Sequence, residues 1–211
     1  MDSRTFVIGR DPVPSYIRLG AGEAVRWTVV VLPGCSGERL CLEVDLDGEG
    51  ADLDLAGLYL CSGDDRVDIR VTVRHNSAGC ESRQLFKGIA GGRARAGFDG
   101  LVYVAHGAGR TRSAQENHSI LLGADARVES RPQLEIYADD VECSHGATTG
   151  FLSADELFYM RSRGIPEHEA RRLQMISFLA PVLERLPEDI SASVSERMEQ
   201  FFDDKLPEHK D

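Results

Sequence analysis

Short β-prone runs separated by glycine-rich turns fill the chain from about residue 15 to residue 150, and they constrain the fold more than any other feature. In residues 66–75 apolar and polar side chains alternate, which is typical of a strand with one buried face. The clearest runs are 25–32, 40–46, 51–60, 66–75, 82–89, 94–104, 120–122 and 133–137. Turns of related composition recur at irregular spacing in residues 20–23, 48–51, 107–109 and 123–126. Many short strands with small turn residues indicate a β-sandwich, a barrel or a β-solenoid.

The rarity of hairpin turns favours the solenoid among these three folds. An Asn-Gly or Asp-Gly pair between two strands is the strongest short-range signal of an antiparallel hairpin. Almost no two-residue turn of this kind joins a clear pair of runs, and Asp99-Gly100 is the exception. We therefore predict a mainly β fold in which residues 1–150 form a parallel β-helix.

Helix signals replace strand signals after Gly150. Residues 153–156 read Ser-Ala-Asp-Glu, a capping box, while Gly164 and Pro166 are typical of one helix ending and another beginning. Two later apolar stripes have helical spacing: Leu173, Ile176, Ala180 and Leu183, then Ile190, Val194, Met198 and Phe201. We predict an α-helical subdomain over residues 151–211. Because a subdomain this small cannot bury every stripe internally, one stripe is expected to face a partner protein.

The charge of the chain argues against several classes of partner. Its net charge is −11, and most of the acidic excess lies in the C-terminal third. Nucleic acids and anionic membranes attract Lys and Arg, so neither is an expected partner. The longest apolar run without a charge, residues 27–37, is too short to span a bilayer. Since no secretory leader is apparent either, we expect a cytoplasmic protein.

A thiol and an imidazole stand close together in Cys143-Ser144-His145. Two residues apart, they point to the same face of an extended chain. Sulfur beside nitrogen suits iron, zinc or copper better than calcium or magnesium. Two ligands leave a metal site incomplete, so another segment or another chain would have to supply the rest. The five cysteines, an odd number without a C-x-x-C pair, argue against a disulfide framework and a four-cysteine zinc module.

Several longer motifs are specific enough to indicate a family. They are residues 83–88 (RQLFKG), Gln115 with Asn117, 132–140 (PQLEIYADD), 143–148 (CSHGAT) and 157–165 (LFYMRSRGI). Between about residue 65 and residue 186 the chain resembles the SufB/SufD family of iron–sulfur cluster assembly proteins, and the SufD branch in particular. Members of that family generally have an N-terminal domain and more rungs, so this chain resembles a member shortened at the N-terminus.

The resemblance implies a right-handed parallel β-helix with a C-terminal helical subdomain. It also implies a non-enzymatic scaffold subunit, in which an iron–sulfur cluster is bound transiently at the interface between two β-helices. His145 matches the interface histidine of the family, and Cys143 is the second candidate ligand. The partner across the interface would be a SufB-like subunit or a second copy of this chain. Ala126 stands where the SufB branch has a cysteine, so the resemblance is to the SufD branch.

The resemblance further implies that SufC, an ABC-type ATPase, docks on the C-terminal helices. No G-x-x-x-x-G-K-[ST] motif is present, so this chain is not expected to bind nucleotide through a P-loop. Two other functions stay open. One is a structural adaptor that dimerises the ATPase without binding metal. The other is a mononuclear zinc or iron hydrolase, which would need a second group of ligands that is not apparent in the sequence.

Overall fold

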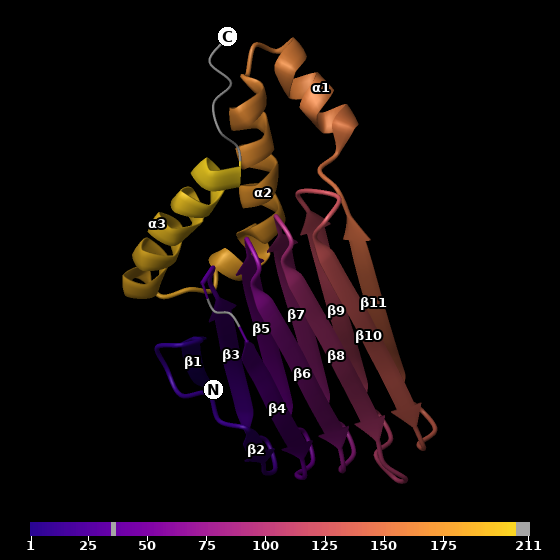
Figure 1. Ribbon diagram of the computed structural model, residues 1–211. Coiled ribbons are helices and arrows are strands. Elements are labelled where there is room, and N and C mark those ends of the chain that lie inside the picture. The colour runs from indigo at the N-terminus through magenta and orange to yellow at the C-terminus, as the bar shows by residue number, and fades with distance from the viewer. Residues whose placement is uncertain (35–36, 206–211) are drawn as a thin grey trace.

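Eleven strands followed by three helices make up residues 1–34 and 37–205, the part of the chain that the computed structural model describes (Figure 1). The strands are β1 (Asp2–Val7), β2 (Tyr16–Leu19), β3 (Ala24–Val31), β4 (Glu38–Leu46), β5 (Asp52–Cys61), β6 (Arg66–His75), β7 (Glu81–Ala90), β8 (Arg95–Val104), β9 (Arg112–Leu121), β10 (Arg127–Ile136) and β11 (Glu142–Gly150). The helices are α1 (Ala154–Ser162), α2 (Glu167–Leu183) and α3 (Glu188–Lys205). None of these described helices combines the length and apolar character that crossing a membrane requires.

Consecutive strands alternate between two sheets, and the paired strands within each sheet run parallel. Sheet A has the order β1-β3-β5-β7-β9-β11, and sheet B has the order β2-β4-β6-β8-β10. Each rung therefore adds one strand to each sheet, and the rungs stack from indigo β1 to orange β11 in Figure 1. The predicted parallel β-solenoid followed by C-terminal helices is confirmed.

Parts of the strand prediction are wrong. Strand β1 lies before the first predicted run, and β9 extends well beyond residues 120–122. Asp99-Gly100 lies inside β8 and makes no hairpin turn. The predicted run covers only the end of β9, because the inward-facing side chains of the strand are polar although they are buried: Ser113, Gln115, Asn117 and Ser119.

Glycines in the left-handed conformation recur at one corner of the solenoid. They lie in the turns that lead from sheet B to sheet A: Gly22, Gly50, Gly79 and Gly107, with φ from 67° to 81°. Residues with a Cβ atom avoid this conformation because Cβ would approach the following carbonyl oxygen. The recurring turns at residues 20–23, 48–51 and 107–109 therefore mark a repeated corner, whereas residues 123–126 lie at the opposite corner, between β9 and β10.

Apolar side chains fill the space between the two sheets in the earlier rungs. Leu53 and Leu55 of β5 and Val71 and Val73 of β6 are fully buried in this cluster. The rings of Phe86 and Phe98, one from each sheet, have centroids 4.9 Å apart. This core joins the two sheets along the solenoid.

Helices α2 and α3 pack on the outer face of sheet A. Their buried side chains form one cluster with outward-facing residues of β5, including Leu58 and Leu60. The stripe predicted for α3 is confirmed, because Ile190, Val194, Met198 and Phe201 are all buried. The stripe predicted for α2 is partly wrong. Leu173 is 40% exposed, and the fully buried apolar side chains of α2 are Ala170, Met175, Leu179 and Val182.

Asp54 ties the helices to sheet A. Its Oδ1 accepts a hydrogen bond from Arg185 Nη1 at 2.8 Å, and its Oδ2 accepts one from Arg26 Nε at 2.8 Å. The Asp54 and Arg185 side chains are each only 17% exposed, so losing one of them would leave a poorly solvated charge. A second link is the hydrogen bond from Arg197 Nη2 to the carbonyl oxygen of Pro33 at 2.7 Å.

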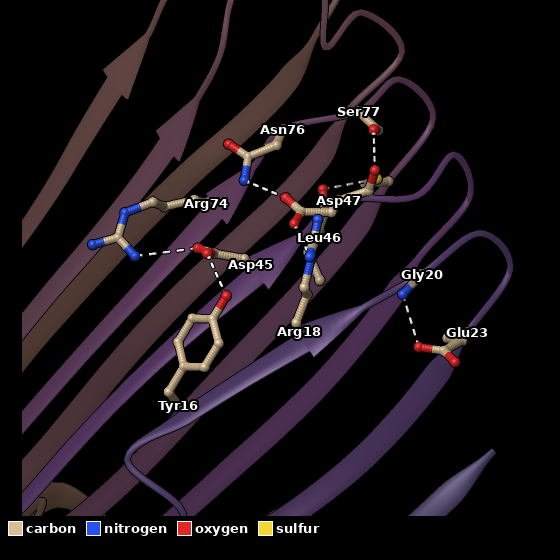
Figure 2. A network of polar contacts seen from close by, with 11 residues as sticks. Tyr16, Arg18, Gly20, Glu23, Asp45, Leu46, Asp47, Arg74, Asn76 and Ser77 are labelled. Carbon is tan, nitrogen blue, oxygen red and sulfur yellow. Dashed lines mark hydrogen bonds and ion pairs between the residues drawn. The ribbon is translucent and has the colours of Figure 1, made fainter.

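Ion pairs on the outer face of sheet B connect successive rungs (Figure 2). Asp45 of β4 accepts hydrogen bonds from the Tyr16 hydroxyl in β2 at 2.9 Å and from Arg74 Nη1 in β6 at 3.1 Å. Asp47 makes a similar contact with Arg18 of β2. Although the Asp45 and Asp47 side chains are only 18% and 22% exposed, their partners Arg74 and Arg18 are 35% and 69% exposed and reach into solvent. Ion pairs on a solvated surface contribute about 0–1 kcal/mol each. The outer face of sheet B is therefore a charged surface in contact with water.

We predict that Gly88→Ala destabilises the protein by about 1–3 kcal/mol, which is the usual cost of overpacking a core. A Cβ atom at Gly88 would lie 1.9 Å from the ring of Tyr59, a fully buried side chain whose hydroxyl is 2.6 Å from that of Ser119. Urea denaturation measures the change. Gly123→Ala is the control, because a Cβ atom there meets no atom within 4 Å. A urea midpoint of unfolding for Gly88→Ala equal to that of the wild type would contradict the close packing of Gly88 against Tyr59.

Candidate functional site

The interior of the solenoid reaches the surface at the last rung. Strand β11 is the end strand of sheet A, and β10 is the end strand of sheet B. On β11, His145, Ala147 and Thr149 pair with residues of β9 that are buried between the sheets, so their side chains face inward. All three are nevertheless exposed, because no further rung of the described chain covers them. This open rung is the orange end of the strand stack in Figure 1.

The strand register places Cys143 and His145 side by side on the inward face of β11. Cys143 pairs with Ser113 and His145 with Gln115, both of which are buried between the sheets. The common face expected from their spacing is therefore present. Glu142 is on the opposite face, where its carboxylate is 3.8 Å from the Arg112 guanidinium.

Cys143 is half-buried among apolar side chains. It packs in a small cluster with Val102, Val104 and Leu134. Burial raises the pKa of the Cys143 thiol, and a hydrogen bond with the backbone of Ser113 opposes part of that rise. The protonated thiol is therefore favoured in the isolated chain. A metal that binds the thiolate would have to displace this proton.

His145 is exposed at the mouth of the open rung. With Cys143 it offers one nitrogen and one sulfur donor, and a neutral imidazole ligates iron through either ring nitrogen. Within residues 1–34 and 37–205, no three His, Cys, Asp or Glu side chains gather in a way that could hold a metal ion.

Buried polar side chains line the interior behind the open rung. His75 Nε2 and the Ser82 hydroxyl oxygen are 2.9 Å apart, and the hydroxyl oxygens of Ser82 and Ser113 are also 2.9 Å apart. In the neighbouring column Gln115 Nε2 donates a hydrogen bond to Gln84 Oε1 at 3.0 Å. The interior thus contains two hydrogen-bonded columns that end at Cys143 and His145.

A third polar group lies deeper along the same strands. The Tyr59 hydroxyl donates to Asn117 Oδ1 at 3.2 Å, and Asn117 Nδ2 donates to the Ser130 hydroxyl at 3.0 Å. Burial raises the pKa of Tyr59 to about 12, so its hydroxyl stays protonated at neutral pH. The core therefore changes from apolar in the early rungs to hydrogen-bonded in the late rungs.

These interior residues were not assigned to the site from the sequence. Gln115 and Asn117 enter the sequence prediction only through the family resemblance. A signal was present, because polar residues occupy every second position of β9 and so lie on one face of the strand. Burial is usually inferred from apolar alternation, and a buried polar face does not show that pattern.

The other residues singled out in the sequence lie apart from Cys143 and His145. Ala126, which the family resemblance aligns with a cysteine of the SufB branch, is fully buried just before β10. Cys41 is exposed, whereas Cys61 and Cys80 are buried. Cys35 lies outside the described residues.

A second surface of interest lies on α1 and the middle of α2. Phe158 is 76% exposed and Tyr159 is 59% exposed. Beside them is a hollow of about 590 Å³ that Tyr159, Met160 and Leu173 line. In Figure 1 α1 projects beyond the ends of the strands. Clustered apolar side chains on a surface mark sites of interaction.

Comparison with known proteins identifies relatives over most of the chain. Residues 14–178 match the family model described as SUF system FeS cluster assembly, SufBD core domain. Iron-sulfur cluster assembly protein SufD of Escherichia coli is 41% identical over 144 residues, which cover 68% of this chain and 34% of that protein. A SufBD family protein of Synechocystis is 33% identical over 183 residues, 86% of this chain and 40% of the relative. SufD of Bacillus subtilis is 33% identical over 143 residues, 68% of this chain and 33% of the relative. The matches span a third to two fifths of each relative.

We predict that His75 makes the protein less stable as the pH falls from 6.5 to 4. Burial lowers the pKa of His75 from 6.5 to about 4, so in this window the unfolded chain binds a proton that the folded chain does not. The contribution of His75 to the free energy of unfolding is complete above pH 6.5. It has fallen by about 3 kcal/mol at a pH low enough for His75 to be protonated in both the folded and the unfolded chain.

Urea unfolding across this pH range measures the effect. His75→Gln, which does not titrate, should give a shallower loss of stability than the wild type. His106→Gln is the control for losing a histidine, because His106 is exposed in the folded chain. The prediction would be contradicted if the free energy of unfolding fell with pH equally steeply in His75→Gln and in the wild type.

Proposed function

The chain belongs to the SufB/SufD family of the SUF system for iron–sulfur cluster assembly, and we propose that it is a scaffold subunit of a SUF-type complex in the cytoplasm. The cluster is its transient cargo, held at an interface with another subunit. The chain itself performs no catalytic step and binds no nucleotide. Residues 1–150 act as the scaffold module, and residues 151–211 act as the docking module for an ATPase.

The position of Cys143 and His145 carries this proposal. Both side chains face inward on β11, at the rung where the interior meets the surface. A thiolate and an imidazole are donors that iron accepts. An iron–sulfur cluster is commonly held by four protein ligands, so this pair would supply part of the set.

A second β-solenoid placed against the open rung would supply the remaining ligands. A SufB-like subunit would bring the cysteine that Ala126 replaces here, whereas a second copy would bring another Cys143–His145 pair. Large apolar side chains at this end of the solenoid support an interface, since Ile136 is 41% exposed and Tyr137 is 49% exposed. The ring of Tyr137 lies 5.4 Å from that of Tyr103, which extends the aromatic surface onto β8.

We predict that His145→Ala and Cys143→Ser each remove most of the cluster that the assembled complex takes up. Each variant deletes one metal donor while leaving the strand pairing of β11 intact. The complex is co-expressed, purified without oxygen and titrated with ferrous iron and sulfide, and the charge-transfer absorption of the cluster is recorded.

Ser144→Ala is the matched control, because Ser144 lies between the two donors but on the outward face of β11. It should retain wild-type uptake. Full uptake by both donor variants would refute the ligand assignment and would favour a structural adaptor that binds no metal.

We also propose that an ABC-type ATPase docks on α1 and the middle of α2. The exposed rings of Phe158 and Tyr159 and the neighbouring hollow support this assignment. Asp155 and Glu156 border the same hollow, so basic groups on the partner would complement it. Helix α1 follows β11 after only three residues, which places the docking surface close to the proposed cluster site along the chain.

We predict that Tyr159→Ala weakens binding of the ATPase about 30-fold or more, as expected for an aromatic interface residue worth about 2 kcal/mol. Isothermal titration of the ATPase into the purified chain measures the affinity. Gln200→Ala, at an exposed position of α3, is the control and should bind as the wild type does. Equal affinities for Tyr159→Ala and the control would place the docking surface elsewhere.

A further inference from the structure

Gln115 is fully buried, yet one end of its side-chain amide has no partner. Its Nε2 donates a hydrogen bond to Gln84 Oε1 at 3.0 Å, whereas its Oε1 makes no hydrogen bond. A buried polar atom without a hydrogen bond destabilises the folded state, because it has lost its contacts with water. Such an atom beside a candidate ligand requires a physical explanation.

The column of side chains shows where this oxygen points. Gln84, Gln115 and His145 occupy the same position in three successive strands of sheet A. Oxygen and nitrogen diverge from the same carbon in an amide. Because Gln115 Nε2 is directed back to Gln84, Oε1 is directed forward to the rung that carries His145.

The side-chain amide of Gln84 points in the same direction as that of Gln115. Its Oε1 accepts the hydrogen bond from Gln115, and its Nε2 is unpartnered on the side of Leu55 in the preceding rung. The two amides form a short ladder whose oxygens face the open end of the solenoid. The last oxygen of the ladder, Gln115 Oε1, points toward the rung that carries His145.

The opposite sheet holds this amide in place. Gly100 of β8 has no side chain, and a Cβ atom built there would lie 2.5 Å from Gln115 Oε1 and 2.6 Å from Nε2. The amide of Gln115 therefore crosses the interior and rests against the backbone of sheet B. A glycine at this position makes room for it.

We propose that Gln115 is a positioning residue for His145. Its Oε1, unpartnered in the structure, accepts a hydrogen bond from one ring nitrogen of His145 when that exposed ring turns toward it. This contact selects the tautomer in which the other nitrogen keeps its lone pair. Histidines that bind metals usually donate their second N–H to a carbonyl or carboxylate in this way. The inference rests on the proposed function for its purpose, because the free nitrogen would be the one that binds iron.

The tautomer of His145 is measured by ¹⁵N NMR of the imidazole ring in the wild-type, metal-free chain. We expect one ring nitrogen with the chemical shift of a protonated nitrogen and the other with that of an unprotonated nitrogen. In Gln115→Met, which keeps the length of the side chain but has no strong acceptor, the two shifts should move toward each other as the tautomers mix. Averaged shifts in the wild type, or unchanged shifts in Gln115→Met, would overturn the proposal.

Two further variants separate positioning from a general disturbance of the interior. Gly100→Ala keeps the glutamine but displaces its amide, and it should mix the tautomers as Gln115→Met does. Ser82→Ala removes a buried polar group from the neighbouring column, and it should leave the shifts of His145 unchanged. Mixing in Ser82→Ala equal to that in Gln115→Met would refute a specific role for Gln115.

Iron binding by the assembled complex tests the purpose of the contact. Loss of an outer hydrogen-bond partner commonly lowers metal affinity about 10- to 100-fold, and we expect a loss of this size in Gln115→Met. Wild-type affinity in Gln115→Met, with His145→Ala still defective, would overturn the positioning role while leaving the proposed function standing. The metal-free NMR experiment tests the contact itself even if His145→Ala shows no loss of iron.

Discussion

Hydrogen bonding between parallel strands in register is the interaction on which the rest of the structure depends. Since side chains alternate across a strand, the register assigns every residue of a rung to an inward or outward column. One inward column runs from Gly57 through Phe86 and Asn117 to Ala147. Rungs differ in length, and the turns absorb the difference. The columns are therefore regular in space although no exact repeat is visible in the chain.

Along these columns the interior changes in chemical character toward the open end. Leu55, Gln84, Gln115 and His145 show the change within one column, from an apolar side chain to two amides and then an imidazole. Buried polar groups have to be hydrogen-bonded to be tolerated, so each late rung constrains the orientation of its neighbours. Packing in the early rungs supplies stability, and hydrogen bonding in the late rungs orients the side chains behind Cys143 and His145.

The helices determine which surfaces remain available to partners. Helices α2 and α3 cover part of the outer face of sheet A, held by the apolar cluster and by the contact of Asp54 with Arg185. Sheet B keeps a charged outer face. The open rung and the apolar side chains of α1 are left as surfaces suited to other proteins, and three residues of chain connect β11 to α1.

The sequence by itself determined the class of fold, because the glycine-rich turns, the scarcity of hairpin signals and the capping box at Ser153 are local features. It also identified Cys143 and His145 as neighbours on one face, since the period of a strand is two residues. It could not reveal β9 as a buried strand, nor that Leu173 of α2 is exposed. The burial of a polar side chain such as Gln115 depends on neighbouring rungs, because its amide nitrogen is bonded to Gln84, which lies 31 residues earlier in the chain. Only the tertiary structure decided that the column behind His145 ends in an unpaired carbonyl oxygen, because register across three strands fixes its direction.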